Sequence, residues 1–132
     1  MTTRRLALVA DDEPSIRNLV TRVVRQLGLD VLAVTNGAAA IAAVQAHRRD
    51  LACAILDVMM PVLNGVDAAH AIQGIAPGLP VVLMSGAIPV QYTEGIERLR
   101  LAGILHKPIA LAALRELIRY NVDDGIAIEA QR

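Results

Sequence analysis

Three carboxylates in this chain could together bind a cation: Asp11, Asp12 and Asp57 each directly follow or end an apolar run. Carboxylates held within a few ångströms of one another repel, and burying them without a partner is costly, so such a cluster needs a positive charge. A hard divalent ion suits a set of oxygen ligands that contains no His or Cys. Mg²⁺ keeps several waters and takes one or two carboxylates directly, so we predict a Mg²⁺ site here.

Two further polar residues, Ser85 and Lys107, also end apolar runs. Lys107 is the only lysine beside twelve arginines, and its ammonium is a compact charge on a flexible stem that can reach a phosphoryl oxygen. Ser85 offers a hydroxyl, and Gly86 next to it leaves room for a bulky anion. A metal and an amine would neutralise charge on a transferred group while a carboxylate attacks it, so the set predicts a phosphoryl-acceptor site.

Short apolar runs alternate with helical patterns along the chain. The runs predict strands at 6–10, 31–34, 52–56, 81–84 and 103–106, and the first run is typical of a strand covered on both faces. The helical patterns lie at 14–27, after a cap at Asn36, at 66–73, from about Thr93, and after Lys107-Pro108. This alternation implies right-handed crossovers and a mostly parallel sheet with helices on both faces. All five polar residues then meet at the carboxyl ends of the strands, where such sheets bind ligands.

The composition excludes several other classes of protein. The 132 residues suit one domain, and 13 basic against 13 acidic residues leave no net charge to attract nucleic acid or a membrane surface. The single Cys53 lies in an apolar run, and neither a leader nor a membrane span is evident. We therefore expect a cytoplasmic protein without a direct nucleic-acid or membrane partner.

Four segments carry a resemblance to a known family. VADDEP, ILDVMMPVLNG, MSG and HKPI resemble, in order and separation, the signature segments of response-regulator receiver domains of two-component signalling. The resemblance covers about residues 5–120. It implies a stand-alone receiver domain at 1–120 and a tail at 121–132. It also implies the flavodoxin-like α/β fold, a doubly wound five-stranded parallel sheet of order 2-1-3-4-5 with five helices. For the tail we rank a frayed, flexible end first, then a cut linker, then a strand added to a neighbour.

The resemblance also implies roles for individual residues. Asp57 would accept a phosphoryl group from a histidine kinase or phosphotransfer protein, and a downstream protein target would read the result. Mg²⁺ would be held by Asp12, Asp57 and the backbone carbonyl of Met59, with Asp11 helping through water. Self-dephosphorylation would be slow at most.

The resemblance extends to the phosphoryl contacts, which it assigns to Ser85 and Lys107, and to a cis peptide before Pro108. In the family an aromatic residue commonly lies three positions before the lysine and swings inward on phosphorylation. Ile104 occupies that position here, so the usual aromatic readout is in question.

Three other functions remain as alternatives. A receiver-fold scaffold that works without phosphorylation is supported by Ile104. A metal-dependent phosphatase is disfavoured because Met59 stands where a second acid would lie two residues after Asp57. A nucleotide-binding domain is disfavoured because the Asp-Asp-Glu-Pro turn would repel a pyrophosphate and is not rich in glycine.

Overall fold

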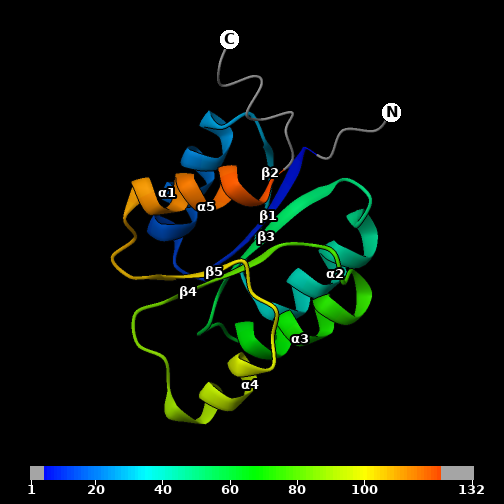
Figure 1. The fold of residues 1–132 in the computed structure, drawn as a ribbon, viewed down its shortest axis with the longest axis vertical. Helices are drawn as coiled ribbons and strands as arrows, with labels where there is room; N and C mark the ends of the chain where they lie inside the picture. Colours follow the sequence, from blue (N-terminus) through cyan, green and yellow to red (C-terminus); the bar gives the residue numbers. More distant parts are fainter. Residues whose placement is uncertain (1–4, 123–132) are drawn as a thin grey trace.

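Five parallel strands form the centre of the molecule in a computed structural model that describes residues 5–122 (Figure 1). They are β1 (Leu6–Ala10), β2 (Asp30–Val34), β3 (Leu51–Asp57), β4 (Val81–Ser85) and β5 (Gly103–His106). Their order in the sheet is β2-β1-β3-β4-β5, so the chain reverses its direction of winding between β1 and β3. The predicted fold class and strand order are confirmed, and the reversal point is where doubly wound sheets bind ligands.

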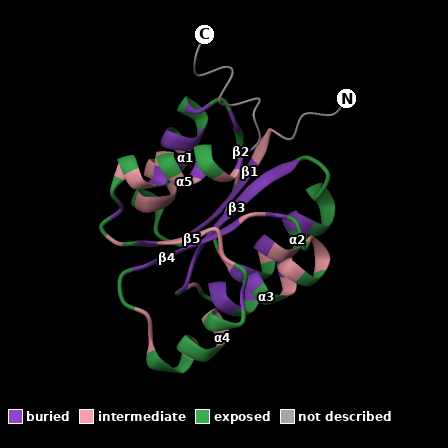
Figure 2. Ribbon diagram, in the orientation of Figure 1, coloured by how far each residue is buried: buried purple, intermediate pink, exposed green. Residues whose placement is uncertain are grey.

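Five α-helices cover the two faces of the sheet. They are α1 (Pro14–Gln26), α2 (Gly37–His47), α3 (Gly65–Ile75), α4 (Thr93–Glu97) and α5 (Leu111–Asn121), with a short 3₁₀ helix η1 (Val90–Tyr92) leading into α4. Figure 1 shows α1 and α5 on one face, and α2, α3 and α4 on the other. This two-sided cover buries the three central strands, β1, β3 and β4, almost completely, whereas the edge strands β2 and β5 stay partly exposed (Figure 2).

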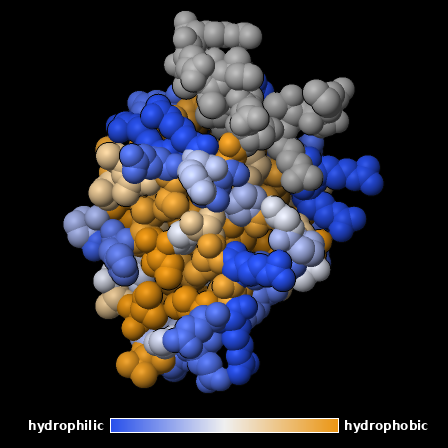
Figure 3. Space-filling model, viewed as in Figure 1, coloured by the Kyte–Doolittle hydropathy of each residue, from blue (hydrophilic) through white to orange (hydrophobic). Residues whose placement is uncertain are grey.

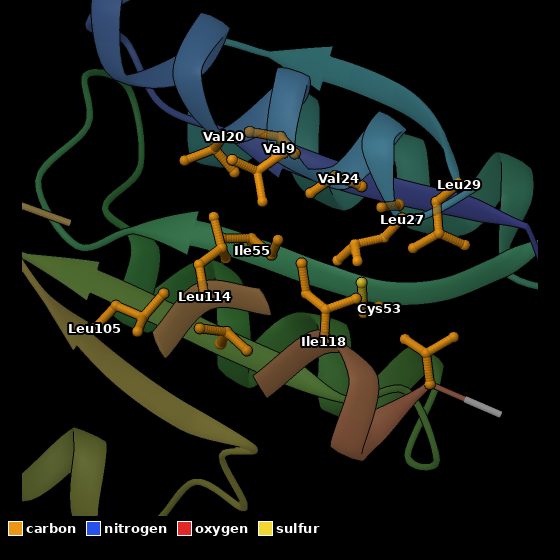
Figure 4. Close-up of a cluster of buried hydrophobic side chains, with 14 of the residues drawn as sticks. Val9, Val20, Val24, Leu27, Leu29, Cys53, Ile55, Leu105, Leu114 and Ile118 are labelled. Atoms are coloured by element: carbon orange, nitrogen blue, oxygen red, sulfur yellow. The ribbon is translucent and has the colours of Figure 1, made fainter. Parts of the chain in front are cut away.

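The core consists of two apolar layers, because successive side chains of a strand point to opposite faces. Val9 and Ile55 face α1 and α5, whereas Leu8 and Leu56 face α2 and α3. Figure 4 shows the first layer, in which residues of the sheet meet side chains of both helices: Val9, Ile55, Val20, Val24, Leu114 and Ile118. Cys53, which lies in an apolar run of the sequence, also belongs to this layer, and burial raises the pKa of its thiol to about 12.

Local signals in the sequence set several helix boundaries. Pro14 is the first residue of α1, where its missing N–H costs no helical bond. The Asn36 side chain accepts a hydrogen bond of 2.8 Å from the Ala39 N–H and so caps α2, as predicted. Gly28 follows α1 with a φ of 92°, which a glycine adopts without steric cost.

The structure corrects the predicted start of the last helix, since α5 begins at Leu111 and not directly after Lys107-Pro108. Ala110 has an extended backbone, and its carbonyl accepts the first helical bond, from the Leu114 N–H at 3.1 Å. The Lys107-Pro108 peptide is cis, as the family resemblance implies. The residues from Lys107 to Ala110 therefore form a loop that carries the chain from β5 into α5.

The described part of the chain ends one residue after α5. Asn121 is the last residue of that helix, and Val122 is buried against the core layer beneath α1 and α5. The rest of the expected tail, residues 123–132, lies outside the described residues.

Candidate functional site

The three predicted carboxylates meet at the carboxyl edge of the sheet. Asp11, Asp12 and Asp57 each offer an oxygen, and these oxygens all lie within 4.8 Å of one another. Asp11 and Asp57 are buried, whereas Asp12 is exposed to solvent. A cluster with two buried acids and one accessible acid is open to a hydrated cation from one side.

The turn between β1 and α1 fixes Asp11 in place. Its N–H donates to the Val34 carbonyl at 3.1 Å, and its Oδ1 accepts from the Glu13 N–H at 2.9 Å. Its carbonyl accepts a 3.0 Å hydrogen bond from Nη1 of Arg17 in α1. Arg17 is not among the predicted site residues, and the only signal in the sequence is its place one helical turn after Glu13.

A close backbone approach holds Asp57 at the end of β3. The Val58 N–H donates to the Met84 carbonyl at 2.9 Å, and the Gly65 N–H donates to the Val58 carbonyl at 2.8 Å. A Cβ atom at Gly65 would lie 2.0 Å from the Asp57 carbonyl oxygen, so only glycine fits there. The loop from Asp57 to α3 is thereby folded back tightly against the strand end.

Lys107 reaches into the acidic cluster from the end of β5. Its Nζ lies 3.3 Å from Oδ2 of Asp11 and 3.3 Å from Oδ2 of Asp57. Its N–H donates to the Ser85 carbonyl at 2.8 Å, which places the lysine beside the end of β4. Among the described residues, Lys107 is therefore the cation that pairs with the buried carboxylates of this site.

Burial and charge shift the pKa values of this group. Burial first, and then the negative charge of Asp11, raise the pKa of Asp57 to about 6, although Lys107 and a hydrogen bond from the Met59 backbone partly oppose the shift. Burial lowers the pKa of Lys107, but Asp57 and Asp11 together outweigh it, so the pKa is raised. Near neutral pH the site thus holds a carboxylate that burial destabilises and an ammonium that the acids stabilise.

Two buried oxygen atoms of the site are incompletely partnered. The Ser85 hydroxyl has no hydrogen-bond partner, and Asp11 Oδ2 has the ion pair with Lys107 but no well-formed hydrogen bond. Buried polar atoms are normally hydrogen-bonded, so such atoms at a sheet edge suit a group that binds there. The all-oxygen donor set and its excess of negative charge fit Mg²⁺.

Met59 and Ile104 have different places around the site. The Met59 side chain is 52% exposed, while its backbone hydrogen-bonds the Asp57 carboxylate. Ile104 is partly buried and packs against the apolar layer beneath α2 and α3. It also lines a groove whose other walls include Leu117 and the exposed Tyr120 of α5. Figure 3 shows apolar surface on this face of the molecule.

Two side chains of α3 hold the segment that follows β4. The His70 Nε2 lies 2.8 Å from the Gly95 carbonyl in α4. The Gln73 Nε2 donates to the Arg100 carbonyl at 2.8 Å, and the Gln73 Oε1 accepts from the Arg100 N–H at 3.3 Å. His70 is exposed, and no local signal in the sequence points to its contact with a residue 25 positions away.

Comparison with known proteins gives a consistent result. The family model described as "Response regulator receiver domain" matches residues 7–119. The chain is 37% identical over 111 residues to the autoinducer 1 sensor kinase/phosphatase LuxN of Vibrio campbellii, covering 84% of this chain and 13% of LuxN. It is 36% identical over 84 residues to the DNA-binding response regulator MtrA of Mycolicibacterium smegmatis, covering 64% of this chain and 36% of MtrA. The chain therefore spans only a part of these two relatives.

Solved structures show the same fold. A response regulator receiver domain protein (CheY-like) of Methanospirillum hungatei matches with a TM-score of 0.82 at 16% identity, over 96% of this chain and 99% of that one. The chemotaxis response regulator CheY4 of Vibrio cholerae matches with a TM-score of 0.78 at 24% identity, over 91% of this chain and 100% of that one. Within residues 5–122, none of the helices has the length and apolar character needed to cross a bilayer.

Proposed function

Because this chain belongs to the response regulator receiver domain family, we propose that it is a signalling switch that accepts a phosphoryl group on Asp57 and then alters its binding to a partner protein. The observation that supports this most strongly is the place of Lys107 Nζ, 3.3 Å from both Asp57 and Asp11. An ammonium shared by two buried carboxylates is available to an anion that arrives on one of them. The Ser85 hydroxyl, buried and without a hydrogen-bond partner, provides a donor beside it.

The proposed reaction is nucleophilic displacement at phosphorus. An Asp57 carboxylate oxygen attacks, a P–O bond forms, and the P–N bond of a phosphohistidine breaks. The electron pair stays on the histidine nitrogen, which takes up a proton from solvent, and Asp57 becomes a mixed anhydride. Since the pKa of Asp57 is about 6, its carboxylate is mostly ionised and able to attack at neutral pH.

The residues around Asp57 also suit a bound cation. Mg²⁺ would be held by Asp12, Asp57 and the Met59 carbonyl, with Asp11 acting through water. When bound, the ion supplies positive charge that offsets the carboxylates and the phosphoryl oxygens. Lys107 and Ser85 would hold the phosphoryl oxygens from the other side.

The partners of the switch follow from this chemistry. The donor is a histidine kinase or a phosphotransfer protein, and the output passes to a downstream protein. LuxN is named as a sensor kinase/phosphatase and MtrA as a response regulator, which supports both halves of this scheme. A two-component switch of this kind works in the cytoplasm, and slow self-dephosphorylation would be its only catalytic activity.

The test is incubation with acetyl phosphate and Mg²⁺, followed by intact-mass measurement. We expect one phosphoryl adduct in the wild type and none in Asp57→Asn, while Glu116→Gln on the exposed side of α5 serves as a control that keeps the adduct. A wild type that binds Mg²⁺ but takes up no phosphoryl group would contradict the switch. It would favour a scaffold that works without phosphorylation, the alternative that Ile104 supports.

A further inference from the structure

Near its start, α1 carries a side chain that no part of the proposed phosphoryl transfer uses. Arg17 is partly buried in the first turns of α1, and its Nη1 donates to the Asp11 carbonyl at 3.0 Å. That carbonyl belongs to the peptide bond that joins Asp11 to Asp12. Because a peptide group is planar, holding its oxygen also fixes the direction in which the chain enters Asp12.

Asp11 is held on each of its other sides as well. Its N–H is bound by the Val34 carbonyl, its Oδ1 by the Glu13 N–H and its Oδ2 by the Lys107 ammonium. With the Arg17 bond added, the N–H, the carbonyl and the Oδ1 atom of Asp11 are all held by hydrogen bonds. Asp12, the exposed member of the acidic cluster, therefore starts from a fixed peptide plane.

We propose that Arg17 is a positioning residue for the cation site, which presets the Asp12 carboxylate by holding the Asp11–Asp12 peptide through its carbonyl. The inference deepens the proposed function, because it concerns how the same site binds Mg²⁺. Residues that orient metal ligands without touching the metal contribute strongly to affinity, and their loss typically weakens binding tenfold or more.

A simple electrostatic role of Arg17 gives the opposite expectation. A guanidinium near the cluster repels a divalent cation, so removing its charge would tighten Mg²⁺ binding. In the positioning role the hydrogen bond matters more than the charge, so removing it weakens binding. The direction of the change in the Mg²⁺ dissociation constant thus separates the two roles.

The experiment is a calorimetric titration of the full chain with MgCl₂ in four variants. Arg17→Met keeps the apolar stem and removes both donor and charge, Arg17→Gln keeps a donor without charge, and Arg17→Lys keeps both. Arg22→Met, at an exposed position five residues further along α1, is the matched control. We expect the Mg²⁺ dissociation constant to rise roughly tenfold in Arg17→Met. Arg17→Gln and Arg17→Lys should recover part of the lost affinity, and Arg22→Met should bind Mg²⁺ as the wild type does.

Two additional measurements keep the test independent of folding and of phosphorylation. Thermal unfolding in EDTA reports any general loss of stability. Adduct formation from acetyl phosphate, measured at increasing Mg²⁺ concentrations, should need more Mg²⁺ in Arg17→Met but should reach the wild-type level at saturating Mg²⁺. Unchanged or tighter Mg²⁺ binding in Arg17→Met would overturn the proposal, even if that variant were less stable. If the wild type takes up no phosphoryl group but Arg17→Met still weakens Mg²⁺ binding, the proposed function fails and the role of Arg17 stands.

Discussion

The Nζ of Lys107 lies at the same distance, 3.3 Å, from Oδ2 of Asp57 and from Oδ2 of Asp11. The ammonium is thus shared between Asp57, the proposed site of phosphorylation, and Asp11, which follows a neighbouring strand. Each contact is longer than the charge-assisted hydrogen bonds of about 2.7–2.9 Å that strong pairs form. The amine can therefore shift toward a phosphoryl group on Asp57 while Asp11 remains as its second partner.

Replacing Lys107 with arginine tests this sharing. Lys107→Arg keeps the charge, so we expect the variant to fold, but a planar guanidinium does not take the place of a compact ammonium between two carboxylates. We expect adduct formation from acetyl phosphate to slow by roughly tenfold, the effect of losing about 1.4 kcal/mol of transition-state stabilisation. Intact-mass time courses measure the rate, and we expect signalling through the loop after β4 to weaken as well.

The reverse replacement, Arg119→Lys, provides the control for Lys107→Arg because Arg119 is exposed on α5. It should phosphorylate at the wild-type rate. A wild-type rate and a wild-type response of the loop in Lys107→Arg would show that any cation at this position suffices.

The raised pKa of Asp57 predicts a dependence of stability on pH. The folded-state value is about 6 against an ordinary 3.8, so the folded protein holds this proton more tightly than the unfolded chain does. The stability that this group contributes is therefore fully present below pH 3.8 and is lost as the pH rises through about 6. We expect metal-free Asp57→Asn to be the more stable protein at pH 7.

The expected gain in Asp57→Asn is modest. At about 1.4 kcal/mol for each pKa unit the shift corresponds to about 3 kcal/mol, and screening by water at the sheet edge reduces this to about 1 to 2 kcal/mol. Urea unfolding in EDTA at pH 4, 5, 6 and 7 measures it, with Glu116→Gln as the control. A difference in unfolding free energy that does not grow between pH 4 and pH 7 would show that the ionisation of Asp57 does not strain the fold.

Mg²⁺ affinity should depend directly on Asp12. Asp12 offers an oxygen within 4.8 Å of the oxygens of Asp11 and Asp57, and it is the exposed acid of the three. Removing a direct ligand should cost more than removing a positioning residue, so we expect Asp12→Asn to weaken Mg²⁺ binding by more than tenfold. Relief of like-charge repulsion should also stabilise its metal-free form slightly. Unchanged affinity in the same calorimetric titration would remove Asp12 from the site.

Much of this architecture was predictable because it rests on local and periodic signals. Short apolar runs are typical of strands in a sheet covered on both faces, and Pro14 and Asn36 mark helix starts by their own chemistry. The meeting of Asp11, Asp57 and Lys107 follows from topology alone, because the carboxyl ends of parallel strands share one edge.

The features that were not predictable depend on contacts between residues far apart in the sequence, or on one residue among several of the same type in a helix. Arg17 is one of several arginines on α1, and only the folded turn shows that it reaches the Asp11 carbonyl. Gln73 and Arg100 are 27 positions apart, so no periodicity links them. The start of α5 was misplaced because an apolar helical pattern continues back to Ile109, which is buried from a loop and not from the helix.

The loop after Ser85 should carry the response to phosphorylation. The Ser85 hydroxyl has no hydrogen-bond partner. The segment that follows runs into α4, and α3 holds this segment through His70 at Gly95 and through Gln73 at Arg100. Since Ile104 cannot make an aromatic swing, we expect backbone amide shifts from Gly86 to Val90 when a phosphoryl group draws the hydroxyl toward it. ¹⁵N-labelled protein with acetyl phosphate measures this.

Two variants test how far the movement of this loop spreads. Ser85→Ala should abolish most of the amide shift changes, since no hydroxyl is left to follow the phosphoryl group. Gln73→Ala should leave the loop response intact but speed hydrogen exchange around α4, because the Arg100 backbone loses both bonds to that side chain. If the amide chemical shifts of the loop stay unchanged on phosphorylation while those of other elements move, the loop does not carry the response.

The lifetime of the phosphorylated state should be long for a receiver domain. Met59 and Ala87 each lie two residues beyond an active-site position, and both are exposed. Neither side chain can hydrogen-bond a water that approaches the phosphoryl group in line. One missing hydrogen bond of about 1 to 1.5 kcal/mol corresponds to roughly tenfold in rate, so we expect Met59→Asn and Ala87→Glu each to shorten the lifetime several-fold. The loss of the adduct is followed by mass after the donor is removed, and equal rates in the wild type and both variants would show that these two positions do not orient water.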